Sequence, residues 1–254
     1  MIPWSDDNPT LRTPVITLLI LCLLGAVWVL VQGAGLSPLA LAASVCNYGM
    51  VPGELTHRAV VGTHIDLGQG IACVVDDAPI NVFTPLTSMF LHGSWSHLLG
   101  NCLFFWVFGN NIEDSMGRLR FVVFYLLCGL AAALAHVAVD PASAVPTVGA
   151  SGAISGVMGA YLILYPRVRV NMFFPPLFFI ALPAWLVLLW WFGLQVLLGL
   201  PQLMQLNREV SSGVAVWAHV GGFVTGAVLI KLFEKRTYVH ERDLWRHRYH
   251  PRAP

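Results

Sequence analysis

The sequence predicts an all-α membrane protein with six transmembrane helices, from its composition and from the length of its apolar stretches. Of its 254 residues, 57% are hydrophobic and 11% are charged, whereas soluble domains carry about 25% charged residues. Six apolar stretches are long enough to cross a hydrocarbon core about 30 Å thick at about 1.5 Å per residue. They lie at residues 15–35, 95–113, 119–139, 149–165, 178–200 and 214–233.

The first stretch is interpreted as a retained span. Ala40-Leu41-Ala42 resembles a signal-peptide cleavage site, so cleavage is the alternative. Against cleavage, the apolar run is longer than a usual signal-peptide core, and Arg12 is the only cation before it. Residues 36–94 then form a long loop of turn signals and short apolar pieces, which we expect to fold on the outer face.

The cysteines divide into two groups. Cys46 and Cys73 both lie in the long outer loop, where oxidation is possible, so a disulfide between them is a hypothesis. Cys22, Cys102 and Cys128 lie within predicted spans and are interpreted as small apolar fillers.

The positions of Lys and Arg predict that both termini are cytoplasmic. Of the 14 cations, only Arg58 and Arg208 fall on the opposite side of the membrane in a six-span topology. We therefore expect a cytoplasmic tail at residues 1–14, a membrane domain at 15–233 and a basic cytoplasmic tail at 234–254 that lies near anionic lipid headgroups. A net charge of +1, with no basic stripe elsewhere, argues against a nucleic-acid partner.

Polar side chains inside the spans converge on one depth. No Asp or Lys lies in a span interior, and the candidates are His97, His136, His219 and the strongly polar Asn101. Spans two, four and six all run inward, so distance from a span's start measures depth. His97, Asn101, Ser151 and His219 fall within about six residues of those starts, which is one shallow layer at about 1.5 Å per residue. One site can hold all four.

The chemistry of these residues supports the grouping. Serine needs a base within hydrogen-bond reach to act as a nucleophile, so Ser151 and His219 form a candidate pair. Gly149 and Gly152 flank Ser151 and let backbone and substrate approach each other closely. The start of span four offers unpaired backbone N–H groups that suit an oxyanion. His97 and Asn101 share a helix face and add side-chain donors. No carboxylate lies at matching depth to orient His219, so we expect a Ser/His dyad.

Simpler structural interpretations stand beside this one. The repeats Gly152-x-x-x-Gly156 and Gly222-x-x-x-Gly226 are typical of helix packing in membranes. A lone membrane His can be a hydrogen-bonded structural group, and Asn101 can link helices. The coincidence in depth favours the functional interpretation.

The sequence favours neither a metal nor a cofactor. It contains no His-Glu-x-x-His motif and no paired intramembrane aspartates. His92 and His97 are five residues apart, a poor spacing for two ligands on one helix.

Four motifs now stand in order along the chain: His92-Gly-Ser-Trp-Ser-His97-Leu-Leu-Gly-Asn101, Gly109-x-x-x-Glu113-x-x-x-Gly117, Gly149-Ala-Ser151-Gly152 and Ala218-His219-x-x-Gly222-x-x-x-Gly226. In order and topology they resemble the rhomboid family of intramembrane serine proteases, over about residues 80–230. The resemblance implies a six-helix fold whose short fourth helix carries the nucleophile.

The resemblance also implies roles for the site residues. Ser151 attacks a peptide bond of a transmembrane substrate, and His219 acts first as base and then as acid. His97, Asn101 and the Ser151 backbone N–H hold the oxyanion, and the substrate helix enters near spans two and five. Bulky residues of the fifth span are then either lipid-facing or part of a gate: Trp185, Trp190, Trp191 and Phe192.

The chain departs from the family pattern at two places. Phe83-Thr84 stands where well-known bacterial members have Trp-Arg, so the outer loop must be anchored differently. Ser155 stands where many members have a Tyr that stacks on the catalytic His, so either another group holds the imidazole of His219 or the ring is held more loosely.

We therefore expect an intramembrane serine endopeptidase that acts on transmembrane protein substrates in the bilayer without a cofactor. The alternatives are a non-catalytic rhomboid-like protein that binds transmembrane clients and a six-span transporter with a histidine proton relay. The small size and the absence of a transit-like N-terminus favour the plasma membrane of a bacterium or archaeon.

Overall fold

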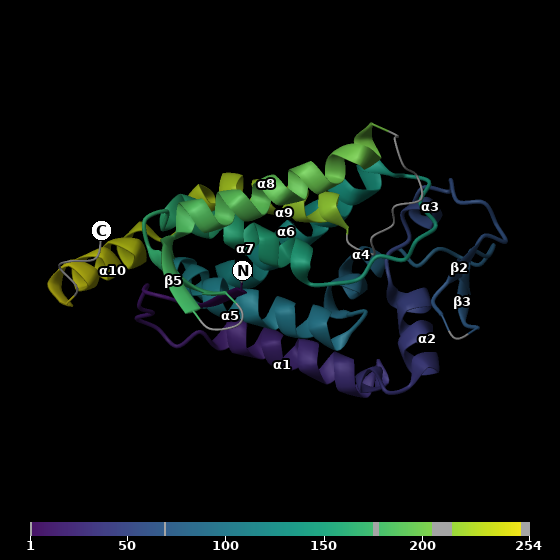
Figure 1. Ribbon diagram of the computed structural model, residues 1–254, viewed down its shortest axis with the longest axis horizontal. Coiled ribbons are helices and arrows are strands. Elements are labelled where there is room, and N and C mark those ends of the chain that lie inside the picture. Colours follow the sequence, from purple (N-terminus) through teal and green to yellow (C-terminus); the bar gives the residue numbers. More distant parts are fainter. Residues whose placement is uncertain (1, 69, 175–177, 205–214, 250–254) are drawn as a thin grey trace.

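The computed structural model describes residues 2–68, 70–174, 178–204 and 215–249. Their helices are α1 (Val15–Leu30), α2 (Pro38–Tyr48), α3 (Pro52–Leu55), α4 (Thr84–Thr87), α5 (Trp95–Met116), α6 (Arg118–Val139), α7 (Ser151–Leu164), α8 (Ala184–Leu203), α9 (Val216–Phe233) and α10 (Arg236–Tyr249). Their strands are β1 (Ile2–Asp6), β2 (His64–Asp66), β3 (Ala72–Val74), β4 (Arg169–Phe174) and β5 (Phe178–Pro183). The long helices follow the long axis of the molecule, with α7 in the middle and α1 and α8 on opposite sides of it (Figure 1).

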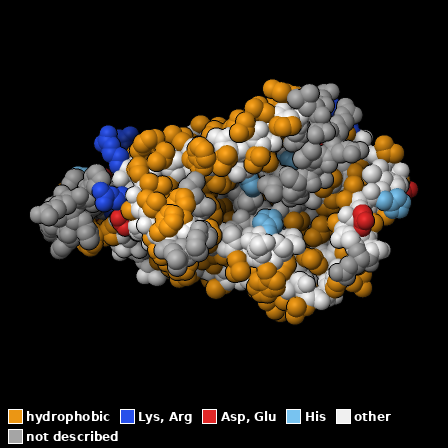
Figure 2. Space-filling view, in the orientation of Figure 1, with side chains coloured by type: hydrophobic (Ala, Val, Ile, Leu, Met, Phe, Trp, Pro, Cys, Tyr) orange, Lys and Arg blue, Asp and Glu red, His pale blue; other side chains and the backbone are white. Residues whose placement is uncertain are grey.

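The helices are those of a membrane protein. Within the described ranges, α6, α8 and α9 are long and apolar enough to cross a bilayer, and α1 and α7 are shorter apolar helices of 16 and 14 residues. Figure 2 shows hydrophobic side chains over much of the visible face, whereas Lys and Arg gather near the end from which α10 projects. This separation of apolar and charged surface is what a bilayer requires.

The chain is mostly helical, as predicted, but residues 178–183 are a strand and not the start of the fifth span. β5 pairs antiparallel with β4, which lies just before it in sequence, and β4 pairs antiparallel with β1 at the distant N-terminal end of the chain, so the three strands form one sheet. Pro183 is extended at ψ 141°, and α8 begins directly after it. A run of apolar residues fits a buried helix or a strand equally well, so apolar length alone places this boundary too early.

Glycines bring α7 and α9 into backbone contact. A Cβ on Gly222 would lie 2.0 Å from the carbonyl oxygen of Gly152, and one on Gly226 would lie 1.9 Å from that of Gly156. No larger residue fits at these two positions of α9 without moving a helix. The predicted small-residue packing is thereby confirmed, and it sets the first turn of α9 beside the first turn of α7.

The described residues of the loop at 36–94 carry α2, α3, β2 and β3 and lie at the end of the molecule opposite α10 (Figure 1). The hypothesised disulfide between Cys46 and Cys73 is present, with a Cα–Cα distance of 5.3 Å, and it joins α2 to β3. Gln32 anchors the loop through two hydrogen bonds to the backbone of His92. The Gln32 Nε2 donates to the His92 carbonyl oxygen at 2.7 Å, and the His92 backbone N–H donates to the Gln32 Oε1 at 2.8 Å. Met50 forms a backbone bridge with Thr147, next to the start of α7.

The N-terminal segment and α10 pack at the other end. Asp6, at the end of β1, accepts hydrogen bonds from Asn111 at 2.9 Å and from Tyr161. Arg242 of α10 is 1% exposed and donates to a carboxylate oxygen of Asp114 at 3.0 Å. Burial raises the pKa of Asp6 to about 7. Both segments are therefore tied to the helices by buried polar contacts.

Candidate active site

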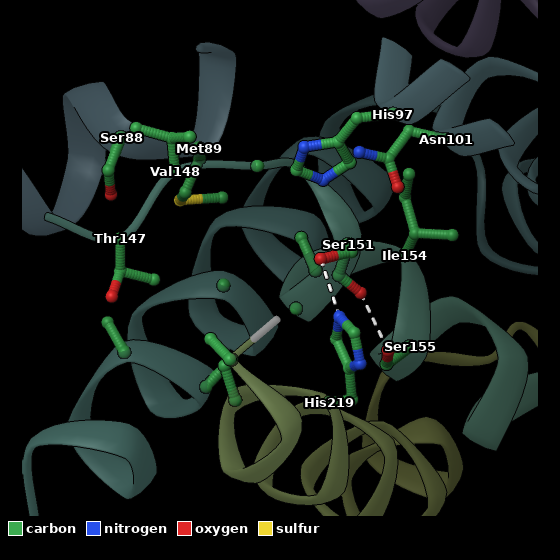
Figure 3. Close-up of a pocket in the computed structure, with 18 of the residues that line it drawn as sticks. Ser88, Met89, His97, Asn101, Thr147, Val148, Ser151, Ile154, Ser155 and His219 are labelled. Carbon is green, nitrogen blue, oxygen red and sulfur yellow. Dashed lines mark hydrogen bonds between the residues drawn. The ribbon is translucent and has the colours of Figure 1, made fainter. Parts of the chain in front are cut away.

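Ser151 and His219 meet where two helices begin. Ser151 is the first residue of α7, and His219 lies in the first turn of α9. The Ser151 Oγ lies 2.7 Å from the His219 Nε2, as the dashed line in Figure 3 shows. When Nε2 is unprotonated it accepts this hydrogen bond, which is the geometry of a nucleophile with its base.

The start of α7 leaves backbone donors free around Ser151. The first intrahelical bond runs from the Ile154 N–H to the Ala150 carbonyl, so the N–H groups of the preceding residues have no acceptor within the helix. They lie at the positive end of the helix dipole. An anion that forms at Ser151 would meet these donors.

Gly149 lets a histidine lie over the backbone that precedes the nucleophile. Its φ of +132° is one that side chains rarely adopt, and a Cβ there would lie 2.8 Å from the His97 Nε2. The His97 Nδ1 lies 3.5 Å from the backbone N–H of Gly93, which donates toward it. With Nδ1 as acceptor, the proton is on Nε2, so His97 presents a donor toward Gly149.

Asn101 lies one turn further along α5, with its amide beside the His97 ring (Figure 3). It is buried, and its Nδ2 has no hydrogen-bond partner within the described part of the chain. A buried amide donor without a partner costs free energy unless a ligand or water accepts from it. Asn101 is therefore available to a group that occupies the site.

These side chains line one cavity of about 540 Å³. Its walls come from α5, α6, α7, α8, α9 and the segments before α5 and α7, and they include all four predicted site residues: His97, Asn101, Ser151 and His219. The shared depth that the sequence predicts is thus matched by shared position. The described residues contain no group of His, Cys, Asp or Glu arranged to hold a metal ion.

Sequence reasoning missed Gln195 of the cavity wall, and it named Trp191 only as a lipid-facing or gate residue and not as a neighbour of His219. The Gln195 Oε1 lies 2.9 Å from the His219 Nδ1. The ring of Trp191 packs against the same imidazole, with the two ring centroids 5.8 Å apart and an interplanar angle of 41°. Both lie on α8, where Gln195 interrupts an apolar stretch. A search that counts amides as well as ionisable groups would have found this signal.

Ser155 does not replace the missing ring. Its Oγ donates to the carbonyl oxygen of Ser151 at 2.6 Å, back along the same helix. The hydroxyl is thereby satisfied inside α7 and does not hold the imidazole. The aromatic neighbour of His219 comes instead from α8.

Two further histidines lie close to the site, His136 on α6 and His92 just before α5. The His136 Nε2 lies 3.1 Å from the Thr147 hydroxyl, which connects α6 to the segment before Ser151. His92 is fully buried and packs edge-to-face on His97, with ring centroids 5.1 Å apart. Burial lowers the pKa of His92 to about 3, so this ring is neutral at physiological pH.

Known proteins resemble this chain over the same region. A family model described as "Rhomboid domain" matches residues 80–236. The Rhomboid protease AarA of Providencia stuartii is 29% identical over 155 residues, which are 56% of this chain and 52% of that protein. The Rhomboid protease GluP of Bacillus subtilis is 39% identical over 77 residues, which are 30% of this chain and 15% of that protein.

A plant relative is similar over a shorter stretch. The Rhomboid-like protein 11 of Arabidopsis thaliana, a chloroplastic protein, is 35% identical over 79 residues, which are 31% of this chain and 28% of that protein. The chain thus spans about half, or less, of the length of these three relatives.

Proposed function

Because this chain belongs to the rhomboid family, we propose that it is an intramembrane serine endopeptidase. The observation that carries the proposal is the hydrogen bond of 2.7 Å between the Ser151 Oγ and the His219 Nε2, at the wall of a cavity and at the start of a helix. A packing role for either residue does not require this pairing. The proposed substrates are transmembrane segments of other proteins.

The first chemical step forms an acyl-enzyme. His219 accepts the Ser151 proton at Nε2 while the Oγ bonds to the scissile carbonyl carbon. The carbonyl oxygen becomes an oxyanion, which accepts from the Ser151 backbone N–H, the His97 Nε2 and the Asn101 Nδ2. His219 then gives its proton to the leaving amine as the C–N bond breaks.

Hydrolysis of the acyl-enzyme repeats the sequence with water. His219 removes a proton from water, the water oxygen attacks the acyl carbon, and the same donors hold the second oxyanion. The Ser151 Oγ then leaves and recovers the proton from Nε2. Each donor of this kind contributes about 2.7 to 4 kcal/mol to catalysis, so the cluster of donors matters as much as the dyad.

The proposed topology is six spans with both termini in the cytoplasm. α5, α7 and α9 each begin at the cavity, which is expected of spans two, four and six when they run in one direction. α7 has 14 residues and is about 21 Å long, shorter than a hydrocarbon core of about 30 Å. Ser151 then lies below the outer surface in a plasma membrane, where water reaches it from outside.

The decisive experiment combines cleavage with active-site labelling. The purified protein is incubated with a membrane-spanning test substrate, and separately with a fluorophosphonate probe. We expect cleavage and labelling by the wild type, and the loss of both in Ser151→Ala and His219→Ala. Ser96→Ala is the matched control, because Ser96 lines the same cavity outside the dyad.

The alternative, a non-catalytic binder of transmembrane clients, makes the opposite prediction. A folded wild-type protein that captures the test substrate but neither cleaves it nor takes the label at Ser151 would overturn the proposed activity. Labelling that persists in Ser151→Ala would equally overturn it.

A further inference from the structure

The imidazole of His219 contacts α8 through the ring nitrogen that does not face Ser151. Gln195 lies 2.9 Å from Nδ1, and Trp191 packs against the ring. The two residues are four apart, so they share one face of α8 and approach His219 together. The imidazole is therefore enclosed by a nucleophile at one nitrogen, an acceptor at the other and an aromatic ring beside it.

The Gln195 contact selects one form of the imidazole. A neutral ring carries its proton on either nitrogen, and only the form with a free Nε2 can accept the Ser151 proton. That form carries its proton on Nδ1, and a buried N–H needs an acceptor. The Gln195 carbonyl oxygen meets this need, whereas the ring without it is free to take the unproductive form.

Within the described residues, the surroundings of His219 provide no other acceptor for the Nδ1 proton. α8 carries no charged residue, and the titratable side chains that interact with His219 in the described part are His97 of α5 and His136 of α6, neither of them an acid. Ser155 is bonded within its own helix. A side-chain amide in an apolar membrane helix costs free energy unless it forms a hydrogen bond, and Gln195 forms one with His219.

We propose that Gln195 is a positioning residue that holds His219 with its proton on Nδ1, and that Trp191 fixes the plane of the ring. The inference rests on the proposed protease function and extends it. The dyad becomes a three-residue array in which a neutral amide takes the place of an acid. The support comes from α8, whereas the family pattern places a supporting ring on the helix of the nucleophile.

Two substitutions test the Gln195 proposal in opposite directions. Gln195→Leu removes the acceptor, and Gln195→Glu keeps it and adds a charge. We expect the leucine variant to lose about three- to tenfold in kcat, with KM unchanged, because one neutral hydrogen bond is lost. We expect the glutamate variant to stay within about threefold of the wild type at its own optimum.

The pH profile separates positioning from packing. The imidazolium is stabilised by an acceptor at Nδ1, and more so by a carboxylate. We expect the acidic half-maximum of kcat/KM to move to lower pH in Gln195→Leu and to higher pH in Gln195→Glu, the latter by about one pH unit or more. A loose or misfolded site lowers the rate at every pH and moves neither limb.

The fluorophosphonate probe separates this role from substrate entry. The probe is small and reports only on the reactivity of Ser151, so labelling should slow in Gln195→Leu by the same factor as cleavage. Gln202→Leu is the matched control, since Gln202 is exposed on the same helix about two turns further on. We expect it to match the wild type in cleavage, labelling and pH profile.

The outcomes distinguish this inference from the proposed function. Wild-type protein without cleavage and without labelling refutes the protease itself. An active wild type whose acidic limb is unmoved, or moved the same way, by both Gln195 substitutions refutes the positioning role alone. Slower cleavage with unchanged labelling in Gln195→Leu would also refute it, because it would place the residue in substrate entry.

Discussion

Gly226→Ala should separate α7 from α9 and destabilise the protein. A Cβ on Gly226 would lie 1.9 Å from the Gly156 carbonyl oxygen, and real Cβ contacts are essentially never closer than 3.0 Å. The helices must therefore move apart by about 1.1 Å at this level, the difference between those two distances. A gap of about 0.5 to 1 Å already removes a quarter to a half of the dispersion energy of the atoms that face it.

The size of the loss follows from two opposing effects. Overpacking of this kind costs about 1 to 3 kcal/mol or more, while alanine in place of glycine recovers up to about 1 kcal/mol of helix propensity. We expect a net loss of about 2 kcal/mol in the free energy of unfolding, or roughly 4 to 8 °C in Tm for a chain of this size. The same movement lengthens the contact between Ser151 and His219, so cleavage and probe labelling should fall as well.

Thermal unfolding of the detergent-solubilised protein measures this effect. Gly25→Ala is the matched control, because Gly25 is also helical and nothing lies within 4 Å of a Cβ placed there. We expect the control to keep the wild-type Tm or to raise it slightly. Equal Tm values for Gly226→Ala and Gly25→Ala would refute the backbone contact between the two helices.

Two further predictions concern a donor in the cavity and a carboxylate outside it. Asn101→Ala should retain cleavage at a rate lower by about 100-fold, because one proposed oxyanion donor is lost while others remain. Asn110→Ala is the control, since Asn110 lies on the same helix outside the cavity, and it should cleave at the wild-type rate. An unchanged rate in Asn101→Ala would remove Asn101 from the proposed oxyanion site. Burial raises the pKa of Asp6 from 3.8 to about 7, so the folded state binds the proton more tightly than the unfolded state, and Asp6 makes stability fall as pH rises from about 4 to 7. Asp6→Asn should therefore gain Tm relative to the wild type across that window and hold a constant gain above it. A Tm difference for Asp6→Asn that is the same at every pH would contradict this assignment.

The site was more predictable than the fold around it. Depth along a membrane helix follows from residue number, because the helix rises by a constant amount and the bilayer sets a common origin. That is why Ser151, His219, His97 and Asn101, from three helices, could be grouped before their contacts were known. Their side chains now line one cavity, while their chemical roles remain the proposals that the experiments above address.

The misses have a common physical cause. In the sheet of β1, β4 and β5, β4 pairs with β1, more than 160 residues earlier, and with β5, which follows it closely along the chain. The local apolar pattern does not show which segments pair, and a short apolar run fits a strand as well as a helix. Gln195 was missed for a related reason. Its residue number places it on a predicted span, but only the rotation and packing of α8 decide that its amide faces His219 and not lipid.

By itself the sequence determined that this is a mostly helical membrane protein and about where its apolar helices lie along the chain, and it predicted that His97, Asn101, Ser151 and His219 belong to one site. These properties follow from residue-by-residue transfer free energies and from the constant rise of a helix, so they need no knowledge of neighbours. The tertiary structure alone decided how α8 and α9 are rotated about α7, which side chain reaches the second nitrogen of His219, and how Gln32 anchors the loop of residues 36–94. Rotation and contact depend on packing among all the helices at once, and a single helix does not encode its own orientation.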